Sequence, residues 1–404
     1  MSSTPPTDPT SSTEHACDRD TLSTQRKLRI ALANPYRWPY VRRGSERVLH
    51  DLSTYLSECD HEITVIASVP ARAETDTAND GMHHVYFQQR LINGGLGRYL
   101  NSAHVFSWQC LRELRHRTFD TMHCLSYYDG FAAARRKAAT GQPFVYQVVG
   151  IPTRRYFRAV PLDRIMFHQT LKRADKVLAC SRHAADCLAS EFGRVAEVLP
   201  PPIDTGHFRP QPREPGPPKI LMVGCVDEPR KGAKLLLQAF FRVKQTVPDA
   251  ILQFSGQASE RTVREVTALI PEHLRRSVEI LGVGKLEDLP GVYSNASLTV
   301  LPSVWEAFGM VLVESLACGT PVVGTNHGGI PGIITDPAIG ACFEPGSTAR
   351  EADNVDGLTQ ALLNVLELSR DSSTADNCRH HAEQFSWKTL GPRYEQAHFD
   401  IVKT

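Results

Sequence analysis

Short apolar runs alternate with amphipathic stretches along most of the chain. Residues 28–33 form an apolar run that ends in Asn34-Pro35, which predicts a strand followed by a turn. Residues 44–57 carry apolar side chains at helical spacing, and residues 62–67 predict the next strand. The alternation continues through 84–88, 98–117, 119–123, 144–149, 163–173, 176–180 and 182–192. Strands that alternate with helices predict a parallel sheet that is covered on both faces.

Eight prolines interrupt this pattern between residues 200 and 218. Such a density does not occur inside a helix or strand, so we predict a stiff linker at 206–218. The alternation then starts again at 219–224 and continues through 233–246, 250–255, 261–269, 278–281, 286–294, 298–301, a helix from about Gly309, 321–323 and 356–367. The pattern predicts two doubly wound α/β domains, at 27–205 and 219–384. We expect the ligand cleft beyond the carboxyl ends of their strands.

The first 26 residues differ from the rest of the chain. They are rich in Ser, Thr, Pro and Asp and contain no apolar run, so we expect a disordered tail at 1–26 and no signal peptide. No window of the chain holds 18 uninterrupted apolar residues, which predicts no membrane-spanning helix.

Composition narrows the class of protein. Lys and Arg number 45 against 44 Asp and Glu, so the bulk charge does not support a nucleic-acid partner. The ten cysteines are scattered without a CxxC pair, which favours reduced thiols in a cytoplasmic protein. No cluster of carboxylates and histidines has the spacing of metal ligands, so we expect no metal cofactor.

A long motif follows the strand predicted at 298–301. It reads Pro302-Ser-Val-Trp-Glu306-Ala-Phe-Gly309-Met-Val-Leu-Val-Glu314-Ser-Leu-Ala-Cys-Gly319-Thr-Pro321. A helix that begins near Gly309 leaves the backbone amides of Gly309, Met310 and Val311 without intrahelical partners. These amides and the positive end of the helix dipole form an anion site suited to a diphosphate.

Two glutamates of this motif are candidate ligands for hydroxyl groups. Glu306 precedes the helix and Glu314 lies inside it, so both side chains can reach one cleft. The ordinary alternative is a terminal charge and a solvated helix face. Glu314 stands within an apolar stretch, where an unpaired carboxylate is costly, and this favours a functional role.

A basic loop follows the first strand of the second domain. It reads Gly224-Cys-Val-Asp-Glu-Pro-Arg230-Lys231-Gly232. The Lys231 ammonium is a compact cation suited to a diphosphate, and the glycines let the backbone approach it closely.

Together these motifs resemble the retaining glycosyltransferases of family four, of the group 1 type. The amino-acid sequence of the basic loop is similar to that of phosphatidylinositol mannosyltransferases. The resemblance implies the GT-B fold, in which two Rossmann-like domains face each other across a cleft. It also implies that a final helix within 385–404, starting near Phe385-Ser-Trp387, crosses back onto the first domain.

The resemblance implies a reaction and a set of site residues. The expected reaction moves a hexosyl group from UDP- or GDP-hexose to an acceptor hydroxyl, with retained configuration and without a metal. Its catalytic residues are expected to be Glu306, Lys231 and His123. The donor-binding residues are expected to be Gly44, Gly224, Arg230, Lys231, Val283, Glu306, Phe308, Gly309, Met310, Val311 and Glu314.

Three positions depart from the family pattern. Arg43 stands where relatives have the first glycine of a Gly-Gly loop, and Leu125 replaces the second histidine of the strand end that carries His123. Cys225 replaces an arginine that often follows Gly224. These departures keep open a catalytically silent protein that binds nucleotide sugars, and a GT-B epimerase or phosphorylase is a further alternative. A core histidine is the alternative role for His123.

The acceptor and the location of the protein are less defined. A small molecule, a glycan or a lipid would each supply a hydroxyl. The basic and aromatic stretch Arg154-Arg-Tyr-Phe-Arg158 predicts either a solvated loop or a contact with an anionic group or lipid headgroup. We expect a cytoplasmic protein, and a peripheral contact with the inner face of the membrane stays open.

Overall fold

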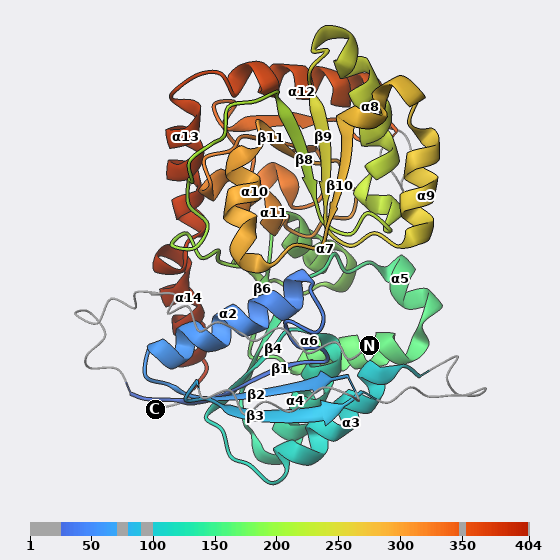
Figure 1. Ribbon diagram of the computed structural model, residues 1–404. Coiled ribbons are helices and arrows are strands. Elements are labelled where there is room, and N and C mark those ends of the chain that lie inside the picture. Colours follow the sequence, from blue (N-terminus) through green and yellow to red (C-terminus); the bar gives the residue numbers. More distant parts are fainter. Residues whose placement is uncertain (1–25, 71–79, 90–99, 347–352, 403–404) are drawn as a thin grey trace, which may run out of the picture.

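The computed structural model describes residues 26–70, 80–89, 100–346 and 353–402. It contains two parallel sheets, each flanked by helices, in two domains that lie one above the other in Figure 1. The strand order is β3-β2-β1-β4-β5-β6-β7 in the first sheet and β10-β9-β8-β11-β12-β13 in the second. The prediction of two doubly wound parallel-sheet domains is confirmed. The predicted tail at 1–26 lies almost entirely outside the described residues.

The first domain is built from the following elements. Its strands are β1 (Arg29–Asn34), β2 (Glu62–Val69), β3 (His83–Gln88), β4 (Thr121–Cys124), β5 (Phe144–Val148), β6 (Lys176–Ala179) and β7 (Glu197–Val198). Its helices are α2 (Gly44–Glu58), α3 (Ser102–Leu114), α4 (Tyr127–Thr140), α5 (Arg154–Ala159), α6 (Pro161–Arg173) and α7 (Arg182–Phe192).

The second domain follows the same scheme. Its strands are β8 (Lys219–Val223), β9 (Ile251–Ser255), β10 (Val278–Gly282), β11 (Leu298–Leu301), β12 (Val322–Thr325) and β13 (Gly340–Phe343). Its α-helices are α8 (Ala233–Thr246), α9 (Glu260–Leu269), α10 (Leu289–Asn295), α11 (Met310–Ala317), α12 (Val355–Leu368) and α13 (Thr374–Ala382). Its 3₁₀ helices are η2 (Pro229–Lys231), η3 (Glu272–Ser277), η4 (Leu286–Asp288), η5 (Ile330–Gly332) and η6 (Glu383–Phe385).

The central strands are buried because helices cover both faces of each sheet. Residues 30–34 of β1 and residues 220–223 of β8 are all buried, as near-continuous apolar runs require in a parallel sheet. In the first domain α3, α4 and α6 lie side by side on one face, and α2 lies on the other (Figure 1).

The last helix, α14 (Trp387–Phe399), belongs spatially to the first domain. It packs on α2 and β5, and the rings of Trp387 and Tyr55 stack with centroids 5.0 Å apart. The red ribbon of α14 can be followed in Figure 1 from the upper domain down to the lower one. His61 and Glu395 add a buried contact of 2.9 Å between Nε2 and Oε1. The C-terminal helix therefore ties the two domains together.

The helix predicted at 44–57 is α2, which begins at Gly44. One local expectation differs from the structure. Residues 154–158, for which a solvated loop was the first alternative, form the short helix α5. Thr153 caps this helix by accepting a hydrogen bond from the Tyr156 amide, and burial of Phe157 anchors it. Along the described segments no helix is both long and apolar enough to cross a bilayer.

Candidate functional site

The start of α11 is shaped by Gly309. This residue has φ 112° and ψ 50°, a conformation that side chains with a Cβ rarely adopt. Met310 is the first helical residue, and no side-chain hydrogen bond caps this end of the helix. The first amides of α11 are thus left for a ligand, and the helix dipole favours an anion there.

The basic loop at 229–232 packs directly against the chain that leads into α11. The Val304 amide donates to the Arg230 carbonyl oxygen at 3.0 Å. A Cβ added at Gly232 would lie 2.4 Å from the Pro302 carbonyl oxygen, so only glycine allows this approach. The two motifs, about 75 residues apart in the chain, therefore form one surface.

Lys231 and Glu306 meet on this surface. The distance from Lys231 Nζ to Glu306 Oε2 is 2.6 Å, and both side chains are more than four-fifths buried. Arg230 Nη1 lies 3.6 Å from the same oxygen, while its Nη2 binds Glu228 at 2.6 Å. A carboxylate and two cations close to a helix start can hold a phosphate and a neighbouring hydroxyl group together.

Glu314 lies deeper in the site. It is buried, and the Tyr293 hydroxyl donates to its Oε2 at 2.7 Å. Burial raises the pKa of Glu314, and the nearby Arg47 guanidinium acts in the opposite direction. A buried carboxylate held by one hydroxyl keeps further lone pairs for a ligand.

Arg47 comes from α2 in the other domain and was not predicted from the sequence. Its Nε donates to Asp51 Oδ2 at 2.7 Å, and its guanidinium lies over the rings of Trp38 and Phe208. Burial acts to lower the pKa of Arg47, but Asp51 and Glu314 raise it overall. Arg47 lies in the helix predicted at 44–57, but neither its burial nor its partner across the boundary could be read from the sequence.

The two domains touch around the start of α11. A Cβ built on Gly44 would lie 3.6 Å from Met310 Sδ, so the first turns of α2 and α11 face each other. Arg42 Nη1 donates to the Gly284 carbonyl oxygen at 3.2 Å, next to Val283, which is 57% exposed. The structure therefore brings Gly44, Met310 and the rim at Val283 to one interdomain boundary.

Other expected donor residues have more internal roles. The Phe308 side chain is buried against Phe385, so a ligand contact falls to its backbone. The Gly224 amide donates to the Ser255 carbonyl oxygen at 2.9 Å and is already used within the sheet. Val311, in the first turn of α11, is half-buried.

His123 lies away from the boundary. It is fully buried, with Nε2 3.0 Å from Gln147 Oε1 and Nδ1 3.3 Å from His398 Nε2 in α14. Burial lowers the pKa of His123 to about 4. In this position the side chain cannot contact a ligand in the cleft, which favours the core-histidine alternative.

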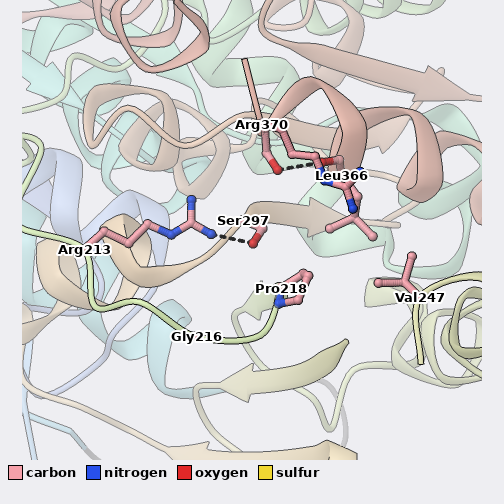
Figure 2. A pocket seen from close by; sticks show the side chains of 8 residues that line it. Arg213, Gly216, Pro218, Val247, Ser297, Leu366 and Arg370 are labelled. Atoms are coloured by element: carbon pink, nitrogen blue, oxygen red, sulfur yellow. Dashed lines mark hydrogen bonds between the residues drawn. The ribbon is translucent and has the colours of Figure 1, made fainter. Parts of the chain in front are cut away.

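A separate pocket lies at the opposite ends of the strands. It is lined by residues that precede β8 and β11, including Pro218 and Ser297, and by Arg213, which donates to Ser297 Oγ at 2.6 Å (Figure 2). Its volume of about 190 Å³ is below the usual range for ligand sites. Ligands of parallel sheets bind at the carboxyl ends, so we assign no donor role to this pocket.

The described residues contain no group of three or more His, Cys, Asp or Glu side chains that could hold a metal ion. Lys231, Arg230 and the uncapped start of α11 place positive charge at this boundary.

Two family models together match the chain from residue 42 to residue 373. Residues 42–207 match "Glycosyltransferase Family 4" and residues 204–373 match "Glycosyl transferases group 1". The chain belongs to the group 1 glycosyltransferases. The second match contains both motifs around Lys231 and Glu306, and the first contains α2 with Gly44 and Arg47.

Individual relatives match parts of this group 1 glycosyltransferase. It is 28% identical over 250 residues to a D-inositol 3-phosphate glycosyltransferase of Segniliparus rotundus, covering 56% of this chain and 53% of that protein. It is also 28% identical over 263 residues to a GDP-mannose-dependent alpha-(1-6)-phosphatidylinositol monomannoside mannosyltransferase of Mycolicibacterium smegmatis, covering 58% and 64%. The match thus spans about half to two-thirds of these two relatives.

The fold has close neighbours among solved structures. Anabaena Alr3699/HepE, solved in complex with UDP and glucose, superimposes with a TM-score of 0.70 and 19% identity, over 92% of this chain and 99% of that one. The predicted GT-B fold is therefore confirmed for this glycosyltransferase.

Proposed function

We propose that this protein transfers a hexosyl group from a nucleoside diphosphate hexose to an acceptor hydroxyl, with retained anomeric configuration. The observation that carries the proposal is the convergence of Lys231, Glu306 and the open start of α11 on one surface. Relatives support the substrate class, since one is named for GDP-mannose and a fold neighbour was solved with UDP and glucose.

The proposed chemistry assigns a task to each group. The bond between the anomeric carbon and the diphosphate breaks, and the acceptor oxygen bonds to the same face of that carbon. The acceptor proton passes to the departing phosphate. Lys231 and the amides of α11 stabilise the charge that grows on this phosphate, so no metal ion is needed.

The two glutamates position the donor. Glu306 orients the sugar through its hydroxyl groups, and Glu314 accepts from the ribose. Lys231 holds Glu306 at 2.6 Å before the donor binds, which keeps both side chains in place for the incoming diphosphate and sugar. Closure of the two domains excludes water from the reacting carbon.

The acceptor side is formed by the first domain, where α2 faces α11. The named relatives act on an inositol phosphate and on a phosphatidylinositol mannoside. We propose an acceptor with a free hydroxyl, and a small molecule, a glycan or a lipid all satisfy the proposed chemistry.

Thermal-shift measurements with UDP-, GDP- and dTDP-hexoses test donor binding, because a ligand of the native state raises the melting temperature. We expect one donor to raise it clearly, in the presence of EDTA as well as without it. Product analysis by NMR with that donor then gives the anomeric configuration and separates transfer from epimerisation. The proposal is wrong if no nucleotide sugar shifts the melting temperature.

A further inference from the structure

The helices α5 and α6 expose an unusual surface on the first domain. Between residues 154 and 173 there are six Lys or Arg side chains and one Asp, a net charge of +5, whereas the whole chain carries +1. The α5–α6 face is defined here by the exposed side chains Arg155, Tyr156, Arg158, Leu162, Arg164, Ile165, His168 and Lys172.

The acidic groups around this face already have other partners. Asp163 is buried, and its oxygens contact Tyr127 Oη at 2.9 Å and His104 Nε2 at 2.8 Å. Glu191 accepts from the Arg154 amide at the start of α5, and Asp175 is paired with Lys137. No ion pair among the described residues engages the guanidinium groups of Arg155, Arg158 or Arg164, in contrast to Arg261 with Glu265 on α9.

Large apolar side chains are exposed among these cations. Tyr156 is 51% exposed, Leu162 40% and Ile165 54%. Residues three apart share a helix face, so Leu162 lies beside Ile165 on α6, and Arg155 lies beside Arg158 on α5. On α6, Met166 and Phe167 therefore point into the core, whereas Leu162 and Ile165 point outwards.

We propose that the α5–α6 face docks the protein on the surface of a bilayer that contains anionic phospholipids. Guanidinium groups bind phosphate oxygens of headgroups, and Tyr, Leu and Ile side chains enter the boundary of the acyl chains. A polyanion in solution would pair with the arginines but would leave Leu162 and Ile165 exposed to water. The combination of cationic and apolar side chains therefore favours a lipid surface.

The position of this face also relates to the cleft. The helix α5 starts six residues after the carboxyl end of β5. The carboxyl ends of the strands in this sheet face the second domain. Figure 1 shows α5 at the upper edge of the first domain, close to the boundary between the domains. If the proposed transfer reaction holds, docking through this face presents the acceptor side of the cleft to lipid headgroups.

Sedimentation with vesicles tests the docking with the full chain. We expect binding to phosphatidylcholine vesicles that contain about a third phosphatidylglycerol, little binding to pure phosphatidylcholine, and release near 1 M salt, where charges are screened within about 3 Å. Replacing Arg155, Arg158 and Arg164 together by Glu should weaken partitioning at least about a hundredfold, because each of the three cations near an anionic surface contributes about fivefold.

Matched variants separate this face from net charge and from general hydrophobicity. Arg264, Arg275 and Arg276 are exposed on the second domain, and their joint replacement by Glu changes the net charge equally but should leave partitioning near the wild-type value. Leu162→Ser with Ile165→Ser should weaken partitioning severalfold. The matched pair Leu269→Ser with Leu281→Ser, exposed by 51% and 47%, should not.

The outcomes distinguish this proposal from the proposed function. Docking is refuted if the wild type ignores anionic vesicles, if both arginine triples behave alike, or if the protein binds single-stranded RNA but not vesicles. The donor-induced thermal shift of each variant is measured in parallel. A variant that keeps this shift is folded, and a wild type that binds vesicles without any donor shift refutes the transfer reaction alone.

Discussion

The first turns of α11 and α2 face each other across the domain boundary, and they are built in different ways. The chain enters α11 through Gly309 in a left-handed conformation, and the basic loop packs against the preceding backbone at Pro302. It enters α2 through Arg43 in an ordinary extended conformation, with no side-chain cap. The α11 side depends on backbone geometry that few sequences allow, whereas the α2 side contributes mainly side chains such as Arg47.

This difference explains why a sequence motif can be recognised more readily on the α11 side than on the α2 side. A φ of 112° at Gly309 and the close backbone approach at Gly232 strongly favour glycine, so the second domain keeps a motif that can be read residue by residue. A helix start with ordinary dihedral angles tolerates many residues, so Arg43 is accepted before α2. We expect substitutions on the α11 side to affect catalysis and those on the α2 side to affect closure and stability.

The largest expected effect is on the α11 side, at Lys231. Lys231→Ala should lower kcat by about a hundredfold or more, because it removes a preorganised charge next to the leaving phosphate. Steady-state kinetics with the donor found by thermal shift measure this. Lys234→Ala, an exposed lysine in the first turn of α8, is the matched control and should stay within about twofold. A Lys231 variant as active as this control contradicts the assignment.

The next effect concerns the α2 side, at Arg47. Arg47→Met should lower the free energy of unfolding by about 3 kcal/mol, because it leaves Asp51 and Glu314 as buried carboxylates without their cation. Urea denaturation measures the change. Adding Asp51→Leu should restore part of the loss, since it removes one of the unpaired charges. Equal stability of Arg47→Met and the wild type would mean that the boundary is open in solution.

His123 tests whether the first domain contributes a buried group to catalysis. Its pKa is depressed by burial from 6.5 to about 4, so its stabilising contribution is present above pH 6.5 and is lost as the pH falls towards 4. The free energy of unfolding of the wild type, relative to His123→Gln, should therefore fall by roughly 3 kcal/mol over this range. The His398 pKa is shifted in the same direction, so the comparison is made between the two proteins at each pH.

Activity at neutral pH completes this test. A core histidine predicts that His123→Gln retains kcat within about threefold, whatever its melting temperature. A loss of tenfold or more with unchanged melting would restore His123 to the catalytic residues.

The smallest effects compare the two helix starts directly. Gly309→Ala places a Cβ at φ 112° and should cost about 1–3 kcal/mol in unfolding free energy, with a matching loss of donor affinity. Gly44→Ala adds a Cβ at an ordinary contact distance of 3.6 Å from Met310 Sδ and should be nearly neutral. Equal effects of the two substitutions would show that the starts of α11 and α2 do not differ in their backbone constraints.

The fold was predictable from the sequence because its main signals are local. Apolar runs such as 28–33 and 219–224 became β1 and β8, since a strand covered on both faces needs an unbroken run. The short helix α5 was missed because its stability comes from the Thr153 cap and the burial of Phe157, and burial is a property of the folded chain.

The candidate site was predictable only where local geometry defines it. The sequence placed Glu306 and Gly309 together because they are neighbours in the chain. It could not show that α14 covers His123, since Gln147 and His398 come from strands and helices up to 275 residues away. Arg47 was missed for the same reason, because its partner Glu314 lies in the other domain.

The return of α14 to the first domain has a consequence for biosynthesis. The ring of Trp387 stacks on Tyr55, and a Cβ at Gly391 would lie within 2.4 Å of the same tyrosine ring, so the helix fits closely into the first domain. A ribosome delivers this helix only after the whole second domain. The first domain therefore cannot complete its interior until α14 has left the exit tunnel, and the surface that α14 covers stays exposed until then.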